Sequence, residues 1–422
     1  MPPVERPAAS RTMSEVHVQP DGDQVWIAHS AIAGTGAGPR VAASQLGAYL
    51  PATHQFVAVL DTTGALGKRI LFPGHGRVLY VAQRGSDRDV FVTVDAAEHR
   101  PLAQRSYPGD RGEFRLSPSG RALIATDRTD QKLHLLDTAS LVDQVVPGGS
   151  DLDPVIWATG EDVLYRLRPQ GTSTEVQRFD LRTADLRKPL PLPSVVTTLP
   201  GLGDWPAVAP DDRFLALVID AGTSASRIAM IDLAAATTRT IAGDVVPAFT
   251  NDDRVVVWQL RPDDTHDLRI VDPATGAASP PVATELVFPV GIPLRHHDLV
   301  LAASTLFEPV AFLYRLADGA RTPVADLSYM TSRFERPGHA ELWMWFEYAD
   351  ALRRLDLETG RITDVVEDAD SVDYRPAADE IVIGTLDHAV RRLSMATAQI
   401  VGPPLVLGDP DATGAPYRLT AE

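Results

Sequence analysis

The chain has 422 residues, of which 44% are hydrophobic and 23% charged, and its formal net charge is −17. This composition excludes disorder for most of the chain, and the acidic balance argues against a nucleic-acid partner, because phosphate binding needs concentrated Lys and Arg. The absence of cysteine excludes disulfides, thiolate metal ligands and a cysteine nucleophile. No apolar run reaches the roughly 18–20 residues that a membrane-spanning helix needs, so we expect no membrane span.

The first residues bear on the compartment of the protein. The segment MPPVERPAASRTMSEV has no apolar core, so it does not have the pattern of a secretory signal. As written, the sequence predicts a cytoplasmic protein, and a native start upstream of Met1 would predict export instead.

The N-terminal region looks irregular. Residues 1–13 are rich in Pro, Ala, Arg and Ser, which predicts a disordered tail. Glu15–Gln19 and Gln24–Ala28 are predicted to form a hairpin. Residues 31–53 are rich in small residues and glycine, which predicts a long inserted loop. We therefore predict an irregular unit over residues 14–61.

Residues 112–149 show the pattern around which the rest of the chain is organised. Turn residues such as Pro118 and Gly120 separate short apolar or alternating runs, as expected of consecutive strands. The four predicted strands are Glu113–Leu116, Ala122–Ala125, Lys132–Asp137 and Leu141–Val146. One four-stranded sheet of this size cannot bury its apolar faces alone, so it must stack on similar sheets.

Similar units recur at intervals of roughly 40–50 residues. Each contains a run that reads as a strand covered on both faces, and the third strand of most units ends in Asp. The runs are Val25–Ala28, Val78–Val81, Ala122–Ala125, Val163–Tyr165, Phe214–Leu217, Val255–Trp258, Leu299–Ala302, Leu342–Trp345 and Ile381–Ile383. This repeat predicts an all-β protein, a single β-propeller of four-stranded blades.

The number of blades is open between eight and nine. Only one strand fits between Asp61 and Val78, so the first repeat of the sequence is interpreted as an incomplete blade. We predict eight blades over residues 62–408, with residues 14–61 packed against the seam and a C-terminal tail at 409–422. A nine-bladed propeller is the alternative.

Several segments resemble known propeller repeats. Residues 206–241 (PAVAPDDRFLALVIDAGTSASRIAMIDLAAATTRTI) resemble a TolB-type repeat, and residues 77–95 (RVLYVAQRGSDRDVFVTVD) are similar to a YVTN-type repeat. Residues 270–282 (IVDPATGAASPPV) and 355–366 (LDLETGRITDVV) resemble the repeat ends of WD-repeat proteins. The resemblance implies the propeller fold, which serves binding, scaffolding and enzymatic functions alike.

Enzyme signatures are missing from the sequence. The phosphate-binding pattern fails around Gly67-Lys68, and neither the G-x-S-x-G nucleophile elbow nor H-E-x-x-H is present. The adjacent His296 and His297 would point to opposite faces of a strand, so we interpret them as turn residues. We predict no catalytic residues and no bound cofactor.

Three acidic clusters could offer oxygen ligands to calcium, but none has the full loop with its terminal Glu. Asp is common in turns because its side chain bonds its own backbone, and we interpret the clusters, like the Asp that ends each third strand, as turn formers. No metal site is therefore predicted. The clusters are Asp263, Asp264 and Asp267; Glu367, Asp368, Asp370 and Asp373; and Asp409 and Asp411.

Two segments are candidates for contact with a partner. The predicted 31–53 loop carries Leu46, Tyr49 and Leu50, and the aromatic strand after Glu341 ends in Phe346 and Tyr348. Core packing is the alternative interpretation of Leu46, Tyr49 and Leu50. It is the favoured interpretation of the aromatic strand, in which Phe346 and Tyr348 are the contact candidates if the strand ends at a rim.

We predict a non-enzymatic propeller that binds a protein partner as a scaffold or sensor module. The alternative is a small-ligand-binding or enzymatic propeller, lactonase-like or quinone-dependent, that uses a central channel.

Overall fold

The structure is a computed structural model of the 422-residue chain. It describes residues 11–419, with gaps at 21–22, 35–38, 63–64, 85–87, 110, 128, 151–154, 159–161, 172, 181–184, 187–189, 193–206, 210, 220–225, 244, 251, 287–289, 295–296, 304–309, 326–331, 347–348, 386–388 and 408–416. The chain divides into two compact units. The first comprises Met1–Asp151, Glu347–Leu352 and Asp364–Glu422, and the second comprises Leu152–Phe346 and Arg353–Thr363.

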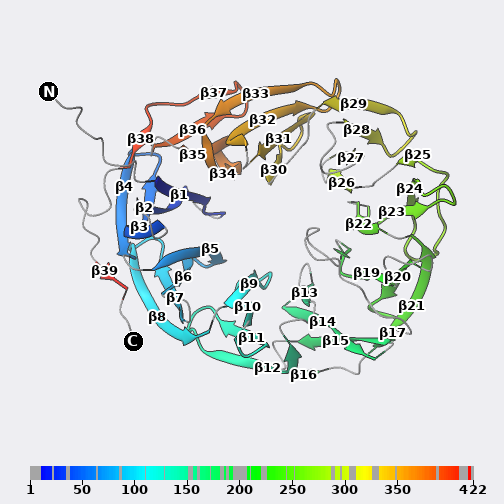
Figure 1. The fold of residues 1–422 in the computed structure, drawn as a ribbon, viewed down its shortest axis with the longest axis horizontal. Coiled ribbons are helices and arrows are strands. Elements are labelled where there is room, and N and C mark those ends of the chain that lie inside the picture. The colour runs from blue at the N-terminus through cyan, green and yellow to red at the C-terminus, as the bar shows by residue number, and fades with distance from the viewer. Residues whose placement is uncertain are drawn as a thin grey trace. The chain divides into compact units, whose positions relative to one another are not determined.

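The first unit contains four sheets, antiparallel except where β39 pairs with β4 (Figure 1). Their strands are β1 (Arg11–Val18), β2 (Val25–Gly34), β3 (Pro39–Leu50) and β4 (Gln55–Asp61), with β39 (Tyr417–Arg418) beyond β4; β5 (Leu66–Gly74), β6 (Arg77–Gln83), β7 (Arg88–Asp95) and β8 (Arg100–Pro108); β9 (Arg111–Leu116), β10 (Ala122–Asp127), β11 (Lys132–Asp137) and β12 (Asp143–Ser150); and β34 (Ala369–Arg375), β35 (Glu380–Thr385), β36 (Ala389–Ser394), β37 (Gln399–Ile400) and β38 (Leu405–Val406).

Five further sheets begin in the second unit. Their strands are β13 (Val155–Trp157), β14 (Val163–Gln170), β15 (Ser173–Asp180), β16 (Asp185–Leu186) and β17 (Leu190–Leu192); β18 (Ala207–Val208), β19 (Phe214–Ile219), β20 (Arg227–Asp232) and β21 (Thr237–Ala242); β22 (Val245–Phe249), β23 (Val255–Leu260), β24 (His266–Val271) and β25 (Ala283–Leu286); β26 (Val290–Leu294), β27 (Leu299–Ala303), β28 (Val310–Arg315) and β29 (Arg321–Ala325); and β30 (Ser332–Glu335), β31 (Glu341–Phe346), β32 (Ala351–Asp356) and β33 (Ile362–Glu367).

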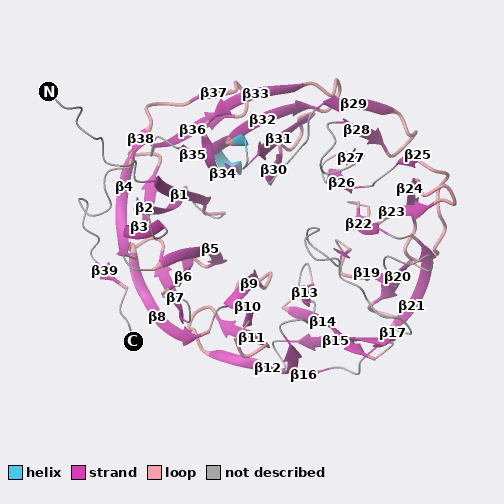
Figure 2. Cartoon of the chain, viewed as in Figure 1, coloured by secondary structure: helices cyan, strands magenta, loops and turns pink. Residues whose placement is uncertain are grey.

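Strands make up nearly all of the regular structure, and the helix drawn in Figure 2 is the three-residue 3₁₀ helix Pro376–Ala378. The predicted all-β class is therefore confirmed, and so is the propeller built from four-stranded blades. The described residues form nine sheets, so the nine-bladed alternative holds in place of the predicted eight blades, because residues 14–61 make a sheet of their own. Among the described residues, no helix is long and apolar enough to cross a membrane.

The sheet β9–β12 shows how the repeat sequence makes a blade. Every residue of β10 is buried, because this second strand is covered on both faces. Gly120 closes the turn between β9 and β10 at φ +70°, where a Cβ would lie 1.8 Å from the carbonyl oxygen of Pro73 in the preceding sheet. The turn therefore needs glycine for its backbone angle and for this close approach.

The Asp that ends a third strand forms the following turn, as predicted. Oδ1 of Asp137 accepts hydrogen bonds from the backbone N–H groups of Ala139 and Ser140, at 3.1 and 2.7 Å. Asp95, Asp232, Asp272 and Asp356 bond the two corresponding N–H groups in the same way. These carboxylates thus have a local structural role.

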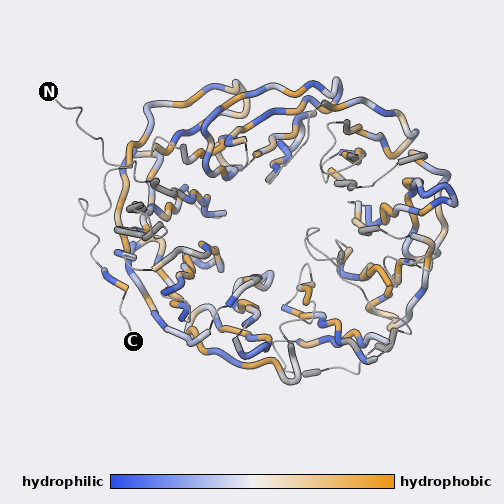
Figure 3. Tube along the Cα trace, in the orientation of Figure 1, coloured by the Kyte–Doolittle hydropathy of each residue, from blue (hydrophilic) through white to orange (hydrophobic). Residues whose placement is uncertain are grey.

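Within each unit, the hydrophobic core lies between neighbouring sheets. One cluster joins Leu79 and Phe91 of β5–β8 to Leu123 and Leu136 of β9–β12, and others join further pairs of sheets. This is the stacking that a four-stranded sheet needs to bury its faces. In Figure 3, hydrophobic stretches also occur on outer strands.

The prediction of a 31–53 loop is wrong, because this segment forms most of the long hairpin β2–β3, in which Ile32 pairs with Val41. Gly47 is needed for packing: a Cβ there would lie 2.3 Å from the Phe56 ring on β4. The region 14–61 is accordingly a complete four-stranded sheet.

Both predicted tails also take part in the first sheet. The prediction of a disordered tail is wrong for residues 11–13, which begin β1. Within the predicted tail 409–422, β39 pairs in parallel with β4, Tyr417 opposite Leu60. Figure 1 shows β39 outside β4, near the C-terminus.

The first and last sheets of the chain meet within the first unit. The backbone N–H groups of Val16 and Val18 on β1 donate to Oγ of Ser371 and Oδ2 of Asp373 on β34, at 3.2 and 2.6 Å. On the other side of the first sheet, Leu419 is buried in a core shared with β5–β8. Segments from both ends of the sequence therefore hold this sheet in place.

Candidate functional site

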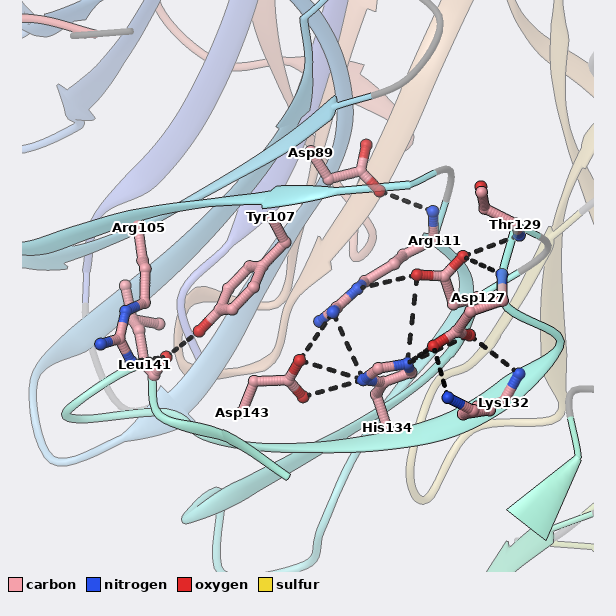
Figure 4. A network of polar contacts seen from close by, with 11 residues as sticks. Asp89, Arg105, Tyr107, Arg111, Asp127, Thr129, Lys132, His134, Leu141 and Asp143 are labelled. Atoms are coloured by element: carbon pink, nitrogen blue, oxygen red, sulfur yellow. Dashed lines mark hydrogen bonds and ion pairs between the residues drawn. The ribbon is translucent and has the colours of Figure 1, made fainter. Parts of the chain in front are cut away.

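A buried group of charged residues lies in the sheet β9–β12, and Figure 4 shows its network of polar contacts. Arg111 begins β9 and stands opposite Asp127, the last residue of β10. His134 lies on β11 and Asp143 begins β12. Each of the four strands thus contributes one member, and strand pairing brings them together. We call Arg111, Asp127, Asp130, His134 and Asp143 the Arg111 cluster.

The contacts within the Arg111 cluster are short. Nη2 of Arg111 donates to Oδ2 of Asp143 at 2.6 Å, and its Nε lies 3.6 Å from Oδ2 of Asp127. The two ring nitrogens of His134 lie 3.0 Å from Oδ2 of Asp143 and 3.1 Å from Oδ2 of Asp130. The Arg111, Asp127 and His134 side chains are only 3–6% exposed. Such a group is stable only when its charges compensate one another.

The surroundings shift the pKa values of two members. Burial of His134 disfavours its charged form, but the hydrogen bond to Asp143 and that to Asp130 outweigh burial and raise the His134 pKa. Burial of Asp143 likewise opposes its charge, but hydrogen bonds from His134 and Arg111 prevail and lower the Asp143 pKa. A raised His134 pKa and a lowered Asp143 pKa both favour the charged forms, and therefore the ion pair between these two residues.

The cluster also ties two sheets together. Oδ2 of Asp89 on β7 accepts a hydrogen bond from the backbone N–H of Arg111 at 2.7 Å. The Arg111 guanidinium stacks 4.4 Å from the centre of the Tyr107 ring on β8. Tyr107 in turn donates to the carbonyl of Leu141 before β12. The charged group is therefore part of the packing between β5–β8 and β9–β12.

Asp127, Asp130 and His134 are the described residues whose ligand atoms come close enough for a metal ion, within 4.8 Å of one another. The other oxygen of Asp127 is already used, because Oδ1 accepts from the backbone N–H of Thr129 at 2.7 Å. The Arg111 guanidinium lies beside Asp127 and supplies the positive charge that a metal ion would otherwise bring to this carboxylate. The arrangement is that of a compensated ion-pair group.

A second feature of the first unit is a pocket of about 400 Å³ between the same two sheets. Three turns line it: the one from β5 to β6, the one from β9 to β10, and the one after β11. The lining residues are Pro73, Gly74, His75, Arg77, Gly120, Arg121, Asp137, Thr138 and Ala139.

The structure places two of the residues proposed to contact a partner inside strand β3. Leu46 and Tyr49 are 0% and 1% exposed, and the Tyr49 hydroxyl is hydrogen-bonded to His54 at 3.1 Å. Leu50 ends β3 half-buried. These positions follow from the correction of the 31–53 loop to strands, since strand interiors pack against neighbouring sheets.

The second proposed contact segment lies at the end of β31. Phe346 is 1% exposed and packs in the core, with the Arg353 guanidinium 4.7 Å from its ring centre. Tyr348 lies outside the described residues.

The acidic clusters contribute to turns and ion pairs where the structure describes them. Asp263 accepts from the Thr265 hydroxyl at 2.7 Å, and Asp267 pairs with Arg269 at 3.1 Å. Oδ2 of Asp373 accepts a hydrogen bond from the backbone N–H of Val18. Asp409, Asp411 and His296 lie outside the described residues.

Sequence reasoning did not find the Arg111 cluster, because its members look like unrelated residues along the chain. The sequence does contain one indication of the cluster. His134 lies on the predicted strand Lys132–Asp137, and Asp127 and Asp130 lie in or next to the turn that precedes this strand. In the hairpin β10–β11 these residues fall at the same end.

No known family profile and no curated protein matches the sequence. Solved structures do match. A eukaryotic initiation factor is similar with a TM-score of 0.56 and 10% identity, over 94% of this chain and 95% of that one. The dihydro-heme d1 dehydrogenase NirN, solved in complex with DHE, is similar with a TM-score of 0.50 and 12% identity, over 77% of this chain and 73% of that one. At these identities the likeness shows the fold alone: the chain is a β-propeller repeat protein.

Proposed function

We propose that the protein is a protein-binding propeller that acts as a scaffold or sensor module. The observation that supports it is the position of the exposed apolar side chains in the first unit. Most of them lie on outermost strands, and each is at least 41% exposed: Leu102 on β8, Val145 on β12, Ile400 on β37, Val406 on β38 and Tyr417 on β39. Val142, which directly precedes β12, is 43% exposed.

An outermost strand offers a partner two kinds of contact. Its outward backbone N–H and C=O groups can pair with an added strand, and its exposed side chains can be buried at the same time. The protein itself contains one example, because β39 adds to the outer edge of β4. Val406 is 69% exposed and is the most exposed large apolar side chain among the described residues.

The test is affinity purification of the tagged protein from its native cells, with quantitative mass spectrometry. We expect a partner that is enriched with the wild type and lost from a Val145→Lys/Val406→Lys variant. Leu260→Lys is the matched control, because Leu260 is 41% exposed but lies on the second strand of its sheet. Equal enrichment by the double variant would refute the proposed surface, and hydrolytic or redox turnover by the purified protein would favour the enzymatic alternative.

A further inference from the structure

The pocket between β5–β8 and β9–β12 has an unusual charge for this protein. Arg77, Arg121 and His75 line it together with a single carboxylate, Asp137. Among the residues that the structure describes, Arg77 and Arg121 make no ion pair within 4 Å. In a chain with a net charge of −17, two such arginines in one pocket are unexpected, since acidic partners are abundant.

Asp137 does not neutralise the pocket by direct pairing. Its Oδ1 accepts three hydrogen bonds: from the backbone N–H groups of Ala139 and Ser140 and from the Ser140 hydroxyl, the last at 2.7 Å. Burial of Asp137 opposes its charge, but these bonds and the field of Arg77 outweigh burial and lower its pKa. The carboxylate is therefore held by its own turn, and the guanidinium groups keep free donors.

The pocket is built on fixed backbone. Gly120 packs directly on the carbonyl of Pro73, and its own carbonyl accepts from the Thr138 hydroxyl at 2.6 Å. The carbonyl of Thr138 accepts from the Thr93 hydroxyl on β7 at 2.8 Å. Thr138 is buried, so these bonds are protected from water. The turns that hold Arg77 and Arg121 are thus tied to both sheets before any ligand arrives.

We propose that this pocket binds a phosphate monoester. Guanidinium groups match the oxygens of a phosphate with paired N–H donors, and the two arginines outnumber the single carboxylate of the pocket. The imidazole of His75 also lines the pocket and offers an N–H donor. A volume of about 400 Å³ accommodates the phosphate with a small organic group attached, such as a phosphorylated side chain or a small metabolite.

Isothermal titration calorimetry at low ionic strength tests the proposal. The probes are a phosphoserine peptide, glycerol 3-phosphate, inorganic phosphate and N-acetylglutamate. We expect saturable binding of at least one monoester, tighter than inorganic phosphate and N-acetylglutamate. The tighter of the two monoesters distinguishes a protein source from a metabolite. Arg77→Gln and Arg121→Gln should each weaken monoester binding about tenfold or more, because each removes a charge-assisted hydrogen bond.

Arg100→Gln is the matched control, because Arg100 is exposed on β8 of the same sheet and outside the pocket. It removes the same charge and should bind like the wild type. Thermal unfolding of each variant verifies folding. Absence of saturable binding, equal binding of N-acetylglutamate, or unchanged binding by both pocket variants would overturn the proposal. Because the probes are small anions, this result is independent of whether the outer strands bind a protein partner.

Discussion

The Arg111 cluster gives the sheet β9–β12 a group of buried charged residues that depend on one another. Arg111 and His134 face the carboxylates of Asp127, Asp130 and Asp143 within 3.6 Å, in a region where an unpaired charge would be costly. Removal of one member leaves the others buried without their partner, so the members depend on one another. Because the contacts of His134 favour its charged form, the contribution of the cluster to stability also depends on pH.

We predict that His134 makes stability fall as pH rises above the unfolded pKa of histidine, about 6.5. Its pKa is raised in the folded protein, so its contribution is complete below its unfolded value of about 6.5 and is lost as pH rises through the folded value. Asp143 acts in the opposite sense, because its lowered pKa makes its contribution disappear in acid. Urea unfolding of the wild type between pH 6 and pH 9 should show the decline.

His134→Gln should flatten this pH dependence, whereas the exposed His339→Gln should leave it unchanged. A His134→Gln variant with the pH dependence of the wild type would contradict the role assigned to the cluster.

At the scale of elements, the second strand of each blade carries the core. Leu123 on β10 is 0% exposed and packs among residues of two sheets. We expect Leu123→Ala to reduce the free energy of unfolding by about 2–5 kcal/mol, through lost burial and the cavity left behind. Leu102→Ala on β8, where the side chain is 42% exposed, should change it by only about 0.5 kcal/mol. Denaturant unfolding compares the two, and similar losses would mean that β10 is not the buried centre of its blade.

Elements of this kind could be predicted because their signals are local. The apolar run Ala122–Ala125 and the Asp137 turn depend on neighbouring residues, and both were predicted. The loop prediction for residues 31–53 depends on their small residues and glycines, whereas one of these, Gly47, makes room for Phe56 on another strand. The Arg111 cluster depends on the register of four strands, which one sequence does not reveal.

At the scale of the first unit, contacts between distant parts of the chain complete the first sheet. Its strand β1 meets β34, and its outer strand β4 meets β39. Leu419, just after β39, is 3% exposed, and its backbone N–H donates to the carbonyl of Asp61 at 3.0 Å. The C-terminal segment is therefore an integral part of this sheet.

We predict that Leu419→Ala lowers the thermal midpoint and increases amide exchange in β4. A buried Leu→Ala change typically costs about 2–5 kcal/mol, and here the loss falls on the contact between β39 and β4. Tyr417→Ala, which removes a side chain that is 41% exposed, is the control and should exchange like the wild type. Hydrogen exchange measured by mass spectrometry separates a local effect on β4 from global unfolding. Unchanged exchange in β4 would show that β39 contributes nothing to its order.

The pairing of β39 with β4 also has a consequence for synthesis of the protein. A ribosome delivers β4 long before β39, so the outer edge of the first sheet stays uncovered while the intervening residues are made. Contacts between such distant residues form slowly, because a long loop must close first. The nascent chain must therefore keep the edge of β4 free from other strands until Leu419 has left the exit tunnel.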